Sequence, residues 1–284
     1  MIKKWFEIIA AGSSKTLESV TSLLIELGSP SILESDENGK KILKAYIPID
    51  SSLNAKINLL KNRLKKYEWT YQGSMFKDKD WLNKWKRYIK PVRISNRLTI
   101  KPTWEKISSK KGQIIVEIDP GMAFGTGSHA STMMCLKAAD RLSALIKGNN
   151  ILDVGTGSGI LAITSAKLGA KKVVGIDIDA EAVKVARKNI RLNRVTDRVI
   201  IYTRPLEKIK GRFSVIFANI IAEELITIAN LLKARLMNNG SLILSGILKE
   251  MAGEVGDAYK GLGLKLFKTY KKGEWVCLIF KKTI

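Results

Sequence analysis

The residues best suited to chemistry form a glycine-rich turn between two acidic side chains. Asp153 opens the run DVGTGSG, in which Gly155, Gly157 and Gly159 occupy alternate positions. Asp177 follows the apolar run VVGI, twenty-two residues after Gly155. Glycine lets the backbone pass close to a ligand, and a carboxylate at the end of the next strand can accept hydrogen bonds from both ribose hydroxyls. The pattern predicts a site for a cofactor that contains adenosine, although glycines alone would also fit an ordinary turn.

The spacing of the glycines indicates which adenosine cofactor the turn binds. Dinucleotide-binding turns read G-x-G-x-x-G, whereas here Ile160 follows Gly159 directly and the pattern is G-x-G-x-G. A pyrophosphate favours helix amides with no anion nearby, so the carboxylate of Asp153 would repel it. S-adenosyl-L-methionine carries a sulfonium cation and an amino group, which a carboxylate attracts. We therefore expect S-adenosyl-L-methionine here, and a nicotinamide oxidoreductase is the less favoured alternative.

Asn219 is the candidate catalytic residue. It follows the run VIFA at the end of a predicted strand, where the transferred methyl group should point. Its side-chain oxygen can accept a hydrogen bond from an amine nucleophile and orient the nitrogen lone pair. A helix N-cap would also explain an asparagine at this position. Ile220, Ile221 and Ala222 stand where methyltransferases of planar amides or bases often carry Pro-Pro-aromatic, which favours a flexible aliphatic amine as substrate.

Upstream of the turn, the run IIVEIDPGMAFGTGSHAST predicts a strand, then a loop and then a helix. Gly121, Gly125 and Gly127 would let this loop form one wall of the cofactor pocket. His129 stands at the start of the predicted helix. A capping or packing role explains this histidine, and a general base is the alternative, for which the sequence offers no partner residue.

Alternating strands and helices place these residues at one edge of a sheet. We predict strands over 150–154, 172–176, 198–203, 213–218, 241–245, 265–270 and 275–281, and helices from the turn to 168 and over 180–192, 222–237 and 249–259. This is an α/β fold with a doubly wound sheet that ends in an antiparallel hairpin. Ligands of such sheets bind at the carboxyl ends of the strands, where the turn, Asp177 and Asn219 all lie.

Residues 1–75 are predicted to form a separate ferredoxin-like α+β domain in the order β-α-β-β-α-β. The strands WFEIIA, SILES, KILKAYIP and WTYQG are interspersed with amphipathic helices near 14–27 and 52–66, and Asn38-Gly39 marks a hairpin. Substrate recognition and a purely structural role both fit such a domain.

A basic linker over 76–96 separates this domain from the methyltransferase domain predicted over 97–284. Trp81, Trp85 and Tyr88 lie on one face of a predicted linker helix that Pro91 ends. The aromatic face would pack on a domain, or the surrounding lysines would contact ribosomal RNA or an acidic partner.

The composition predicts a soluble globular protein that is attracted to polyanions. The chain has 284 residues, 45% of them hydrophobic, and a net charge of +23, and such a charge favours contact with nucleic acid. Cys135 and Cys277 are the two cysteines and His129 is the one histidine, which excludes a disulfide framework and a Cys/His zinc site. We expect no metal, no membrane span and a place in the reducing cytoplasm.

Together these motifs resemble one family. The runs DPGMAFGTGSHAST, ILDVGTGSGILAITSAKLGA, VVGIDID, ANIIA and LILSGIL are similar to those of the ribosomal protein L11 methyltransferases, which are class I methyltransferases. The similarity extends over the basic linker and, more loosely, over the N-terminal domain. The glycine turn is shared by class I methyltransferases in general, whereas the loop and the asparagine motif are specific to this family.

The resemblance implies an activity and a set of contacts. The family uses S-adenosyl-L-methionine to trimethylate the N-terminal α-amine and lysine ε-amines of ribosomal protein L11, which its N-terminal domain recognises. Carried over by motif, the cofactor contacts are Thr132, Gly155, Asp177 and Asn219. We expect direct in-line methyl transfer, in which the enzyme positions the amine and excludes water. A monomeric state and incidental contact of the linker with ribosomal RNA are further expectations.

The sequence departs from the family pattern in three places and leaves two other functions open. Ser128 and residues 130–131 replace parts of the usual Thr-His-Pro-Thr-Thr, and Thr156 replaces a common cysteine. An RNA methyltransferase would also fit the net charge of +23. A non-catalytic ribosome-binding module would retain the glycine turn without any methyl transfer.

Overall fold

The computed structural model describes residues 5–29, 32–37, 39–76, 90–108, 111–119 and 127–283. The chain divides into two compact units, residues 1–89 and 90–284. The predicted linker helix around Trp81 and Trp85 lies outside the described residues. Among the helices described, none combines the length and the apolar character that crossing a membrane requires.

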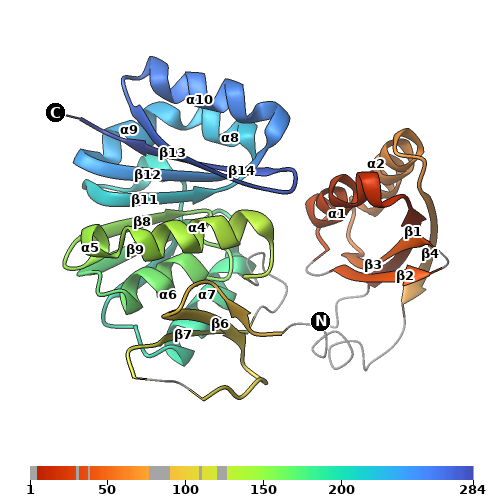
Figure 1. Cartoon of the computed structure of the whole chain (residues 1–284), viewed down its shortest axis with the longest axis horizontal. Helices are drawn as coiled ribbons and strands as arrows, with labels where there is room; N and C mark the ends of the chain where they lie inside the picture. Colours follow the sequence, from red (N-terminus) through yellow and green to blue (C-terminus); the bar gives the residue numbers. More distant parts are fainter. Residues whose placement is uncertain are drawn as a thin grey trace. The chain divides into compact units, whose positions relative to one another are not determined.

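The first unit is a four-stranded antiparallel sheet covered by two helices on one face (Figure 1). Its elements are β1 (Trp5–Gly12), a 3-10 turn η1 (Ser14–Thr16), α1 (Leu17–Glu26), β2 (Ile32–Glu37), β3 (Lys40–Pro48), α2 (Leu53–Lys66) and β4 (Thr70–Phe76). The strands are ordered β2-β3-β1-β4, and every neighbouring pair is antiparallel. The element order is the β-α-β-β-α-β that the sequence predicts.

Apolar residues at helical spacing hold these helices on the sheet. Leu24 of α1 and Leu64 of α2 are buried in one cluster together with the inward side chains of the strands. Trp69 closes one end of this cluster, because its ring packs over Gly12, where a Cβ atom would overlap it. The indole nitrogen Nε1 of Trp69 donates a hydrogen bond to Thr16 Oγ1 at 2.9 Å. A glycine and a tryptophan far apart in sequence therefore fix the end of the sheet.

The second unit is built on a seven-stranded sheet. Its strands are β8 (Asn150–Val154), β9 (Lys172–Asp177), β10 (Val199–Thr203), β11 (Phe213–Asn219), β12 (Leu236–Leu248), β13 (Lys265–Lys272) and β14 (Trp275–Lys281). They are ordered β10-β9-β8-β11-β12-β14-β13, and the first five are parallel. Strand β14 runs antiparallel to both of its neighbours. The predicted doubly wound sheet with a terminal antiparallel hairpin is confirmed.

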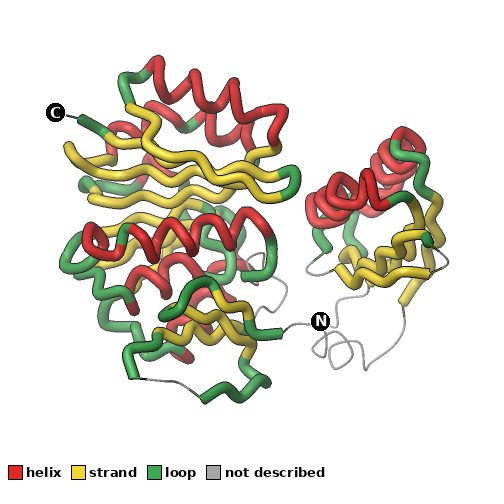
Figure 2. Tube along the Cα trace, in the orientation of Figure 1, coloured by secondary structure: helices red, strands yellow, loops and turns green. Residues whose placement is uncertain are grey.

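Helices cover both faces of this sheet (Figure 2). The helices α4 (Ala130–Arg141), α5 (Ser143–Ile146), α6 (Ile160–Lys167) and α7 (Ala180–Leu192) lie on one face, and α8 (Ala222–Thr227), α9 (Ala229–Arg235) and α10 (Ala252–Gly261) lie on the other. Two 3-10 turns, η2 (Leu206–Lys208) and η3 (Lys249–Met251), lie in the connections. Along β11, Phe217 packs into the core of the first face and Ile216 into that of the second. The strand is buried on both sides, as its continuous apolar run requires.

A second, three-stranded sheet packs beside α6 and α7. It consists of β5 (Val92–Arg93), β6 (Leu98–Pro102) and β7 (Ile114–Ile118), of which only β7 matches a predicted strand. Asn189 of α7 and Asn193, which directly follows this helix, hold the sheet. Asn193 Oδ1 accepts from the amide of Glu117, and Asn189 Oδ1 accepts from the amide of Asp119, both at 2.9 Å. Asp119, the residue directly after β7, is thereby fixed against α7.

The predicted single helix over 222–237 is wrong, because the chain forms the two short helices α8 and α9. They meet at Ile228, which has φ −93° and ψ 7°. Three β-branched residues in succession, Ile226, Thr227 and Ile228, disfavour a continuous helix at this point. Strand β12 also begins earlier than predicted, at Leu236, where it pairs with the start of β11.

Both cysteines lie in the core between α4 and β14. Cys135 and Cys277 are free thiols with no exposed surface. A hydrogen bond with Cys277, together with burial, holds the pKa of the Cys135 thiol well above its ordinary value. The pair therefore packs as two small apolar side chains.

Candidate active site

The turn between β8 and α6 contains three residues in the left-handed region. Gly155, Gly157 and Gly159 have φ of 68°, 54° and 83°, values that other residues adopt only with strain. A Cβ atom on Gly155 would overlap Ile220, and one on Gly159 would lie 3.2 Å from the Cβ of Ala186. The three predicted glycines are thus required by the shape of the turn, which presents bare backbone at the carboxyl edge of the sheet.

Asp153 lies beneath this turn and holds it together. Its side chain is 1% exposed, and Oδ2 accepts hydrogen bonds from Thr156 Oγ1 at 2.6 Å and from the amide of Ala162 at 3.1 Å. Burial raises the pKa of the Asp153 carboxyl to about 7. Asp153 therefore shapes the backbone of the turn. Because of its raised pKa, its carboxyl carries less than the full negative charge that the sequence predicts near neutral pH. Its contact with a cofactor stays a prediction.

Asp177 provides the carboxylate at the rim of the site. It ends β9, is partly exposed, and accepts hydrogen bonds from the amide of Gly157 at 2.9 Å and from the amide of Asp179 at 3.0 Å. A carboxylate has about four acceptor positions on its two oxygens. The structure therefore joins Asp177 to the glycine turn and leaves it able to accept hydrogen bonds from a ligand.

Asn219 and Thr132, which lie 87 residues apart, meet at the same edge. Asn219 ends β11, and its Nδ2 donates to Thr132 Oγ1 of α4 at 3.3 Å. The Oδ1 atom of Asn219 is buried and has no hydrogen-bond partner within the described part of the chain. The N-cap position of α8 is Ile221, so the alternative explanation of Asn219 as a helix cap is wrong. Its side-chain oxygen is an acceptor that a ligand can satisfy.

Comparison with known proteins decides the family. The family described as Ribosomal protein L11 methyltransferase (PrmA) matches residues 4–283. The chain belongs to this family. Members of the ribosomal protein L11 methyltransferase family from Geotalea daltonii and Geobacter metallireducens are each 39% identical to it, over 96% and 99% of both chains respectively. A crystal structure described as ribosomal protein L11 methylase from Lactobacillus delbrueckii subsp. bulgaricus has a TM-score of 0.64 and 34% identity, and it covers 69% of this chain and 100% of its own.

The geometry fits S-adenosyl-L-methionine, the cofactor of the ribosomal protein L11 methyltransferase family. The glycine turn has no side chains of its own at Gly155, Gly157 and Gly159, and the Asp177 carboxylate can accept from the ribose hydroxyls. The buried Oδ1 of Asn219 lacks a partner that a bound molecule would supply. The individual cofactor contacts of Thr132, Gly155 and the other residues of the set stay predictions.

Gly246 supports the backbone next to Asn219, although the sequence motifs do not single it out as a functional residue. It lies in an irregular stretch of β12 with φ 80°, and a Cβ atom there would overlap the carbonyl oxygen of Ile220 and lie 3.0 Å from its carbonyl carbon. The preceding residue, Ser245, pairs with Asn219 and donates to the carbonyl of Ser131 at 3.3 Å. The sequence signal for this role is the glycine that interrupts the apolar strand run LILSGIL. It lets the backbone after Asn219 lie directly against β12.

His129 has a packing role. It occupies the N-cap position of α4 without a side-chain cap bond, its Nδ1 lies 2.8 Å from Ser131 Oγ, and its ring meets that of Trp275 edge to face at 4.7 Å between centroids. Burial, and then the charge of Lys272, lower the pKa of His129 to about 4. A base this weak is poorly matched to removing a proton from an amine, which disfavours the alternative of a general base.

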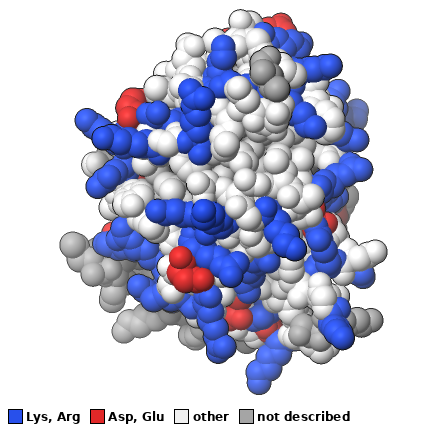
Figure 3. Space-filling view, turned by 90° about the vertical axis from the view of Figure 1, so that its left-hand side faces the viewer, with Lys and Arg blue, Asp and Glu red and all other residues white. Residues whose placement is uncertain are grey.

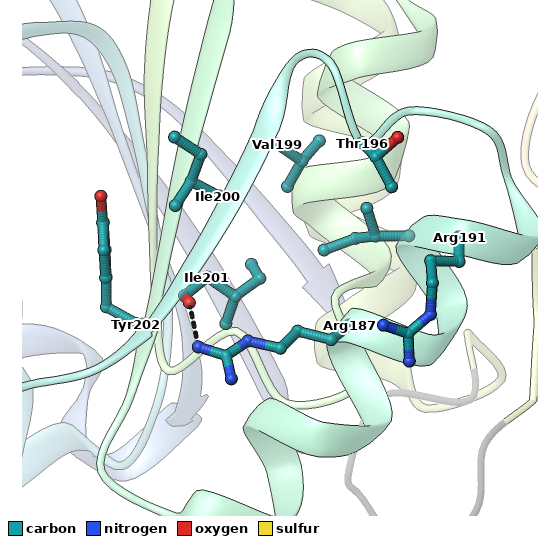
Figure 4. A pocket seen from close by; sticks show the side chains of 8 residues that line it. Arg187, Arg191, Thr196, Val199, Ile200, Ile201 and Tyr202 are labelled. Atoms are coloured by element: carbon teal, nitrogen blue, oxygen red, sulfur yellow. Dashed lines mark hydrogen bonds between the residues drawn. The ribbon is translucent and has the colours of Figure 1, made fainter.

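A groove of about 320 Å³ lies between α7 and the edge strand β10 (Figure 4). Its lining includes Arg187, Arg191 and Tyr202 but none of the predicted site residues. The connection from β10 to β11 contains only η2, so no full helix covers this side of β10. Arg187 spans the groove and donates to the carbonyl of Ile201 at 2.9 Å. Its guanidinium thus ties α7 to the edge strand.

Proposed function

We propose that this chain is an S-adenosyl-L-methionine-dependent protein N-methyltransferase that trimethylates lysine ε-amines and the N-terminal α-amine of ribosomal protein L11. Membership of the ribosomal protein L11 methyltransferase family supports methyl transfer to that protein. The chemistry of the site supports an amine as the acceptor.

The observation that carries the proposal is the unpartnered side-chain oxygen of Asn219 at the carboxyl edge of β11. An amine that donates one N–H to this oxygen is held with its lone pair free to attack. Thr132 Oγ1 accepts from the amide nitrogen of the same side chain. This contact holds the Asn219 side chain in place before the amine arrives.

The bound cofactor supplies an electrophilic methyl group, whose bond to sulfur breaks as its bond to nitrogen forms. A lysine amine has an ordinary pKa near 10.4 and reacts only in its neutral form. Burial and a neighbouring cation lower the pKa of such an amine, so that its proton leaves to water before transfer. With His129 at a pKa of about 4, the described residues position the amine and exclude water, and no dedicated base is required.

Apolar side chains at the same edge suit the aliphatic part of a lysine. Ile178, directly after Asp177, is 79% exposed, and Ile221, two residues after Asn219, is 54% exposed. Large apolar side chains with this exposure are stabilised when a ligand or a substrate chain covers them. Their aliphatic character favours an alkyl amine over a planar base.

The proposal is tested by incubating the full chain with unmethylated L11, with ribosomal RNA and with tritiated S-adenosyl-L-methionine. We expect label in the protein, and mass increments of three methyl groups on lysine and on the N-terminus. Asn219→Ala should lower kcat by about 100-fold, as loss of a positioning contact does, with calorimetric cofactor affinity changed far less. Asn238→Ala, on the exposed start of β12, is the matched control. Label in RNA alone, or full activity of Asn219→Ala, would refute the proposal.

We further propose that the unit over 1–75 recognises L11, that 76–96 links it to the methyltransferase domain over 97–284, and that the chain acts as a monomer in the cytoplasm. The separate core of the first unit supports an independent role. Leu59 and Met75 expose 38% and 58% of their surface on this unit. Changing both to Glu should raise KM for L11 and leave kcat unchanged if the unit binds the substrate.

A further inference from the structure

Every strand of the seven-stranded sheet has a basic residue at the edge opposite the glycine turn. This edge holds the amino ends of the parallel strands and of β13, and the carboxyl end of β14. In the order of the strands, the residues are Arg198, Lys172, Lys147, Arg212, Arg235, Lys282 and Lys265. We call these seven residues the basic edge.

Few carboxylates neutralise the basic edge. Within the described residues, only Arg198 of the seven forms an ion pair, with Asp197 at 3.3 Å. Five of the seven, including Lys147, Lys172 and Arg212, are exposed to solvent. Figure 3 shows this side of the molecule, with Lys and Arg spread over it and little Asp or Glu. The positive charge of this surface is therefore available to a partner.

Lys282 of the basic edge lies among other positive charges. Lys282 Nζ donates to the carbonyls of Leu236 at 2.9 Å and Lys233 at 3.3 Å. Burial, followed by the charges of Arg212 and Lys233, lowers the pKa of Lys282. The Nε of Arg235 is buried with no hydrogen-bond partner among the described residues. An anion bound here would relieve the repulsion.

The dimensions of the basic edge favour a nucleic-acid backbone. Seven strands at about 4.8 Å spacing extend the row over about 29 Å. A nucleic-acid duplex carries about one negative charge per 1.7 Å of its axis, whereas an extended acidic peptide carries at most one per 3.3 Å or so. The basic edge can therefore contact several phosphates of a duplex at once. An acidic peptide of the same length carries fewer negative charges.

We propose that the basic edge binds the phosphate backbone of RNA, without base specificity, on the side of the sheet opposite the cofactor site. The choice of RNA over DNA rests on the proposed function, because a ribosomal substrate is accompanied by RNA. Since the glycine turn and Asn219 lie at the other edge, RNA held in this way leaves the methyl-transfer site open. The RNA is a docking partner here and receives no methyl group.

The test measures the affinity of the full chain for a fluorescent 30-base-pair RNA duplex between 50 and 300 mM salt. The test variant combines Lys147→Gln, Lys172→Gln and Arg212→Gln, all at exposed positions of the basic edge. The control variant removes the same charges from the exposed face of α2, with K61Q, R63Q and K65Q. Glutamine is a good helix former, so α2 should remain folded. Circular dichroism checks both variants.

We expect the test variant to lose about three units from the slope of log K against log salt, about one per phosphate contact, and to bind at least tenfold more weakly at 100 mM salt. The control variant should retain most of its slope. Equal losses in both variants would show attraction by net charge alone and overturn the proposal. Competition by polyglutamate at equal charge concentration would overturn it as well, in favour of an acidic protein partner. Methyl transfer to free L11, measured in parallel, should be unchanged, so failure of this proposal is distinguishable from failure of the proposed activity.

Discussion

A single methyl group added to Gly246 should displace Asn219, the proposed catalytic residue. Gly246 has φ 80°, and a Cβ atom there would overlap the carbonyl oxygen of Ile220, the residue directly after Asn219. The overlapped atom belongs to the backbone, so no side-chain rotation can relieve the clash. The Gly246→Ala variant therefore has to move the chain that carries Asn219.

The expected magnitude follows from this geometry. A left-handed conformation costs alanine about 1–2 kcal/mol. Restoring an ordinary contact distance of about 3.5 Å to the Ile220 oxygen requires a shift of about 1 Å. A misplacement of this size at a reacting group lowers the rate about 100-fold. We therefore expect Gly246→Ala to lower kcat about 100-fold while the folded structure, although less stable, persists.

The assay compares steady-state methyl transfer to L11 with calorimetric binding of S-adenosyl-L-methionine. The loss should fall mainly on kcat, because the clash is with the backbone next to Asn219, whereas only the side chain of Ile220 reaches Gly155. Gly253→Ala is the matched control: Gly253 lies exposed in α10, and a Cβ atom there meets no atom within 4 Å. It should retain kcat and gain up to about 1 kcal/mol of stability. A Gly246→Ala enzyme with the kcat of the Gly253→Ala enzyme would refute the positioning role.

Substitutions at three further residues test the groups around the site. Burial raises the pKa of Asp153 to about 7, against 3.8 in the unfolded chain. The folded state therefore binds the proton more tightly, and the free energy of unfolding falls by up to about 4 kcal/mol as the pH rises from about 4 to 7. Asp153→Asn should abolish this fall, as measured by urea titrations across this pH range. Burial lowers the pKa of His129 to about 4, against 6.5 in the unfolded chain. Its contribution to the free energy of unfolding therefore rises as the pH rises from about 4 to 6.5. His129→Gln should remove this rise in the same urea titrations. Thr132→Val removes the acceptor of the Asn219 amide and should lower kcat about tenfold, as loss of one hydrogen bond of about 1.4 kcal/mol does. Thr132→Ser keeps the hydroxyl and should retain kcat. Equal kcat values for the two variants would show that this hydrogen bond does not contribute to the rate.

The sequence predicted most of the methyltransferase sheet because each element there has a strong local signal. The continuous apolar runs before Asp177 and Asn219 are typical of buried parallel strands, and the boundaries of α7 match the prediction, Ala180–Leu192. The family was predicted from the motifs and is confirmed by the match over residues 4–283.

Other features depend on contacts between distant parts of the chain, which local patterns do not reveal. The burial of Asp153 beneath its own turn reduces the negative charge that the sequence predicts for it, because burial favours the neutral carboxyl. The role of Gly246 depends on the approach of Ile220, a residue on another strand connection. Strands β5 and β6 are short, and the sheet that they form with β7 is held by hydrogen bonds from Asn189 and Asn193, which are far away in the sequence.

The two enclosed thiols provide a built-in reporter of motion at the site. Cys135 belongs to α4, the helix that carries Thr132, and Cys277 faces it from β14. A thiol reagent can reach either sulfur only when α4 separates from the sheet. The rate of thiol labelling in the native enzyme therefore measures how often α4 separates from the sheet. A lower labelling rate in the presence of S-adenosyl-L-methionine would measure how much the bound cofactor stabilises the packing of α4.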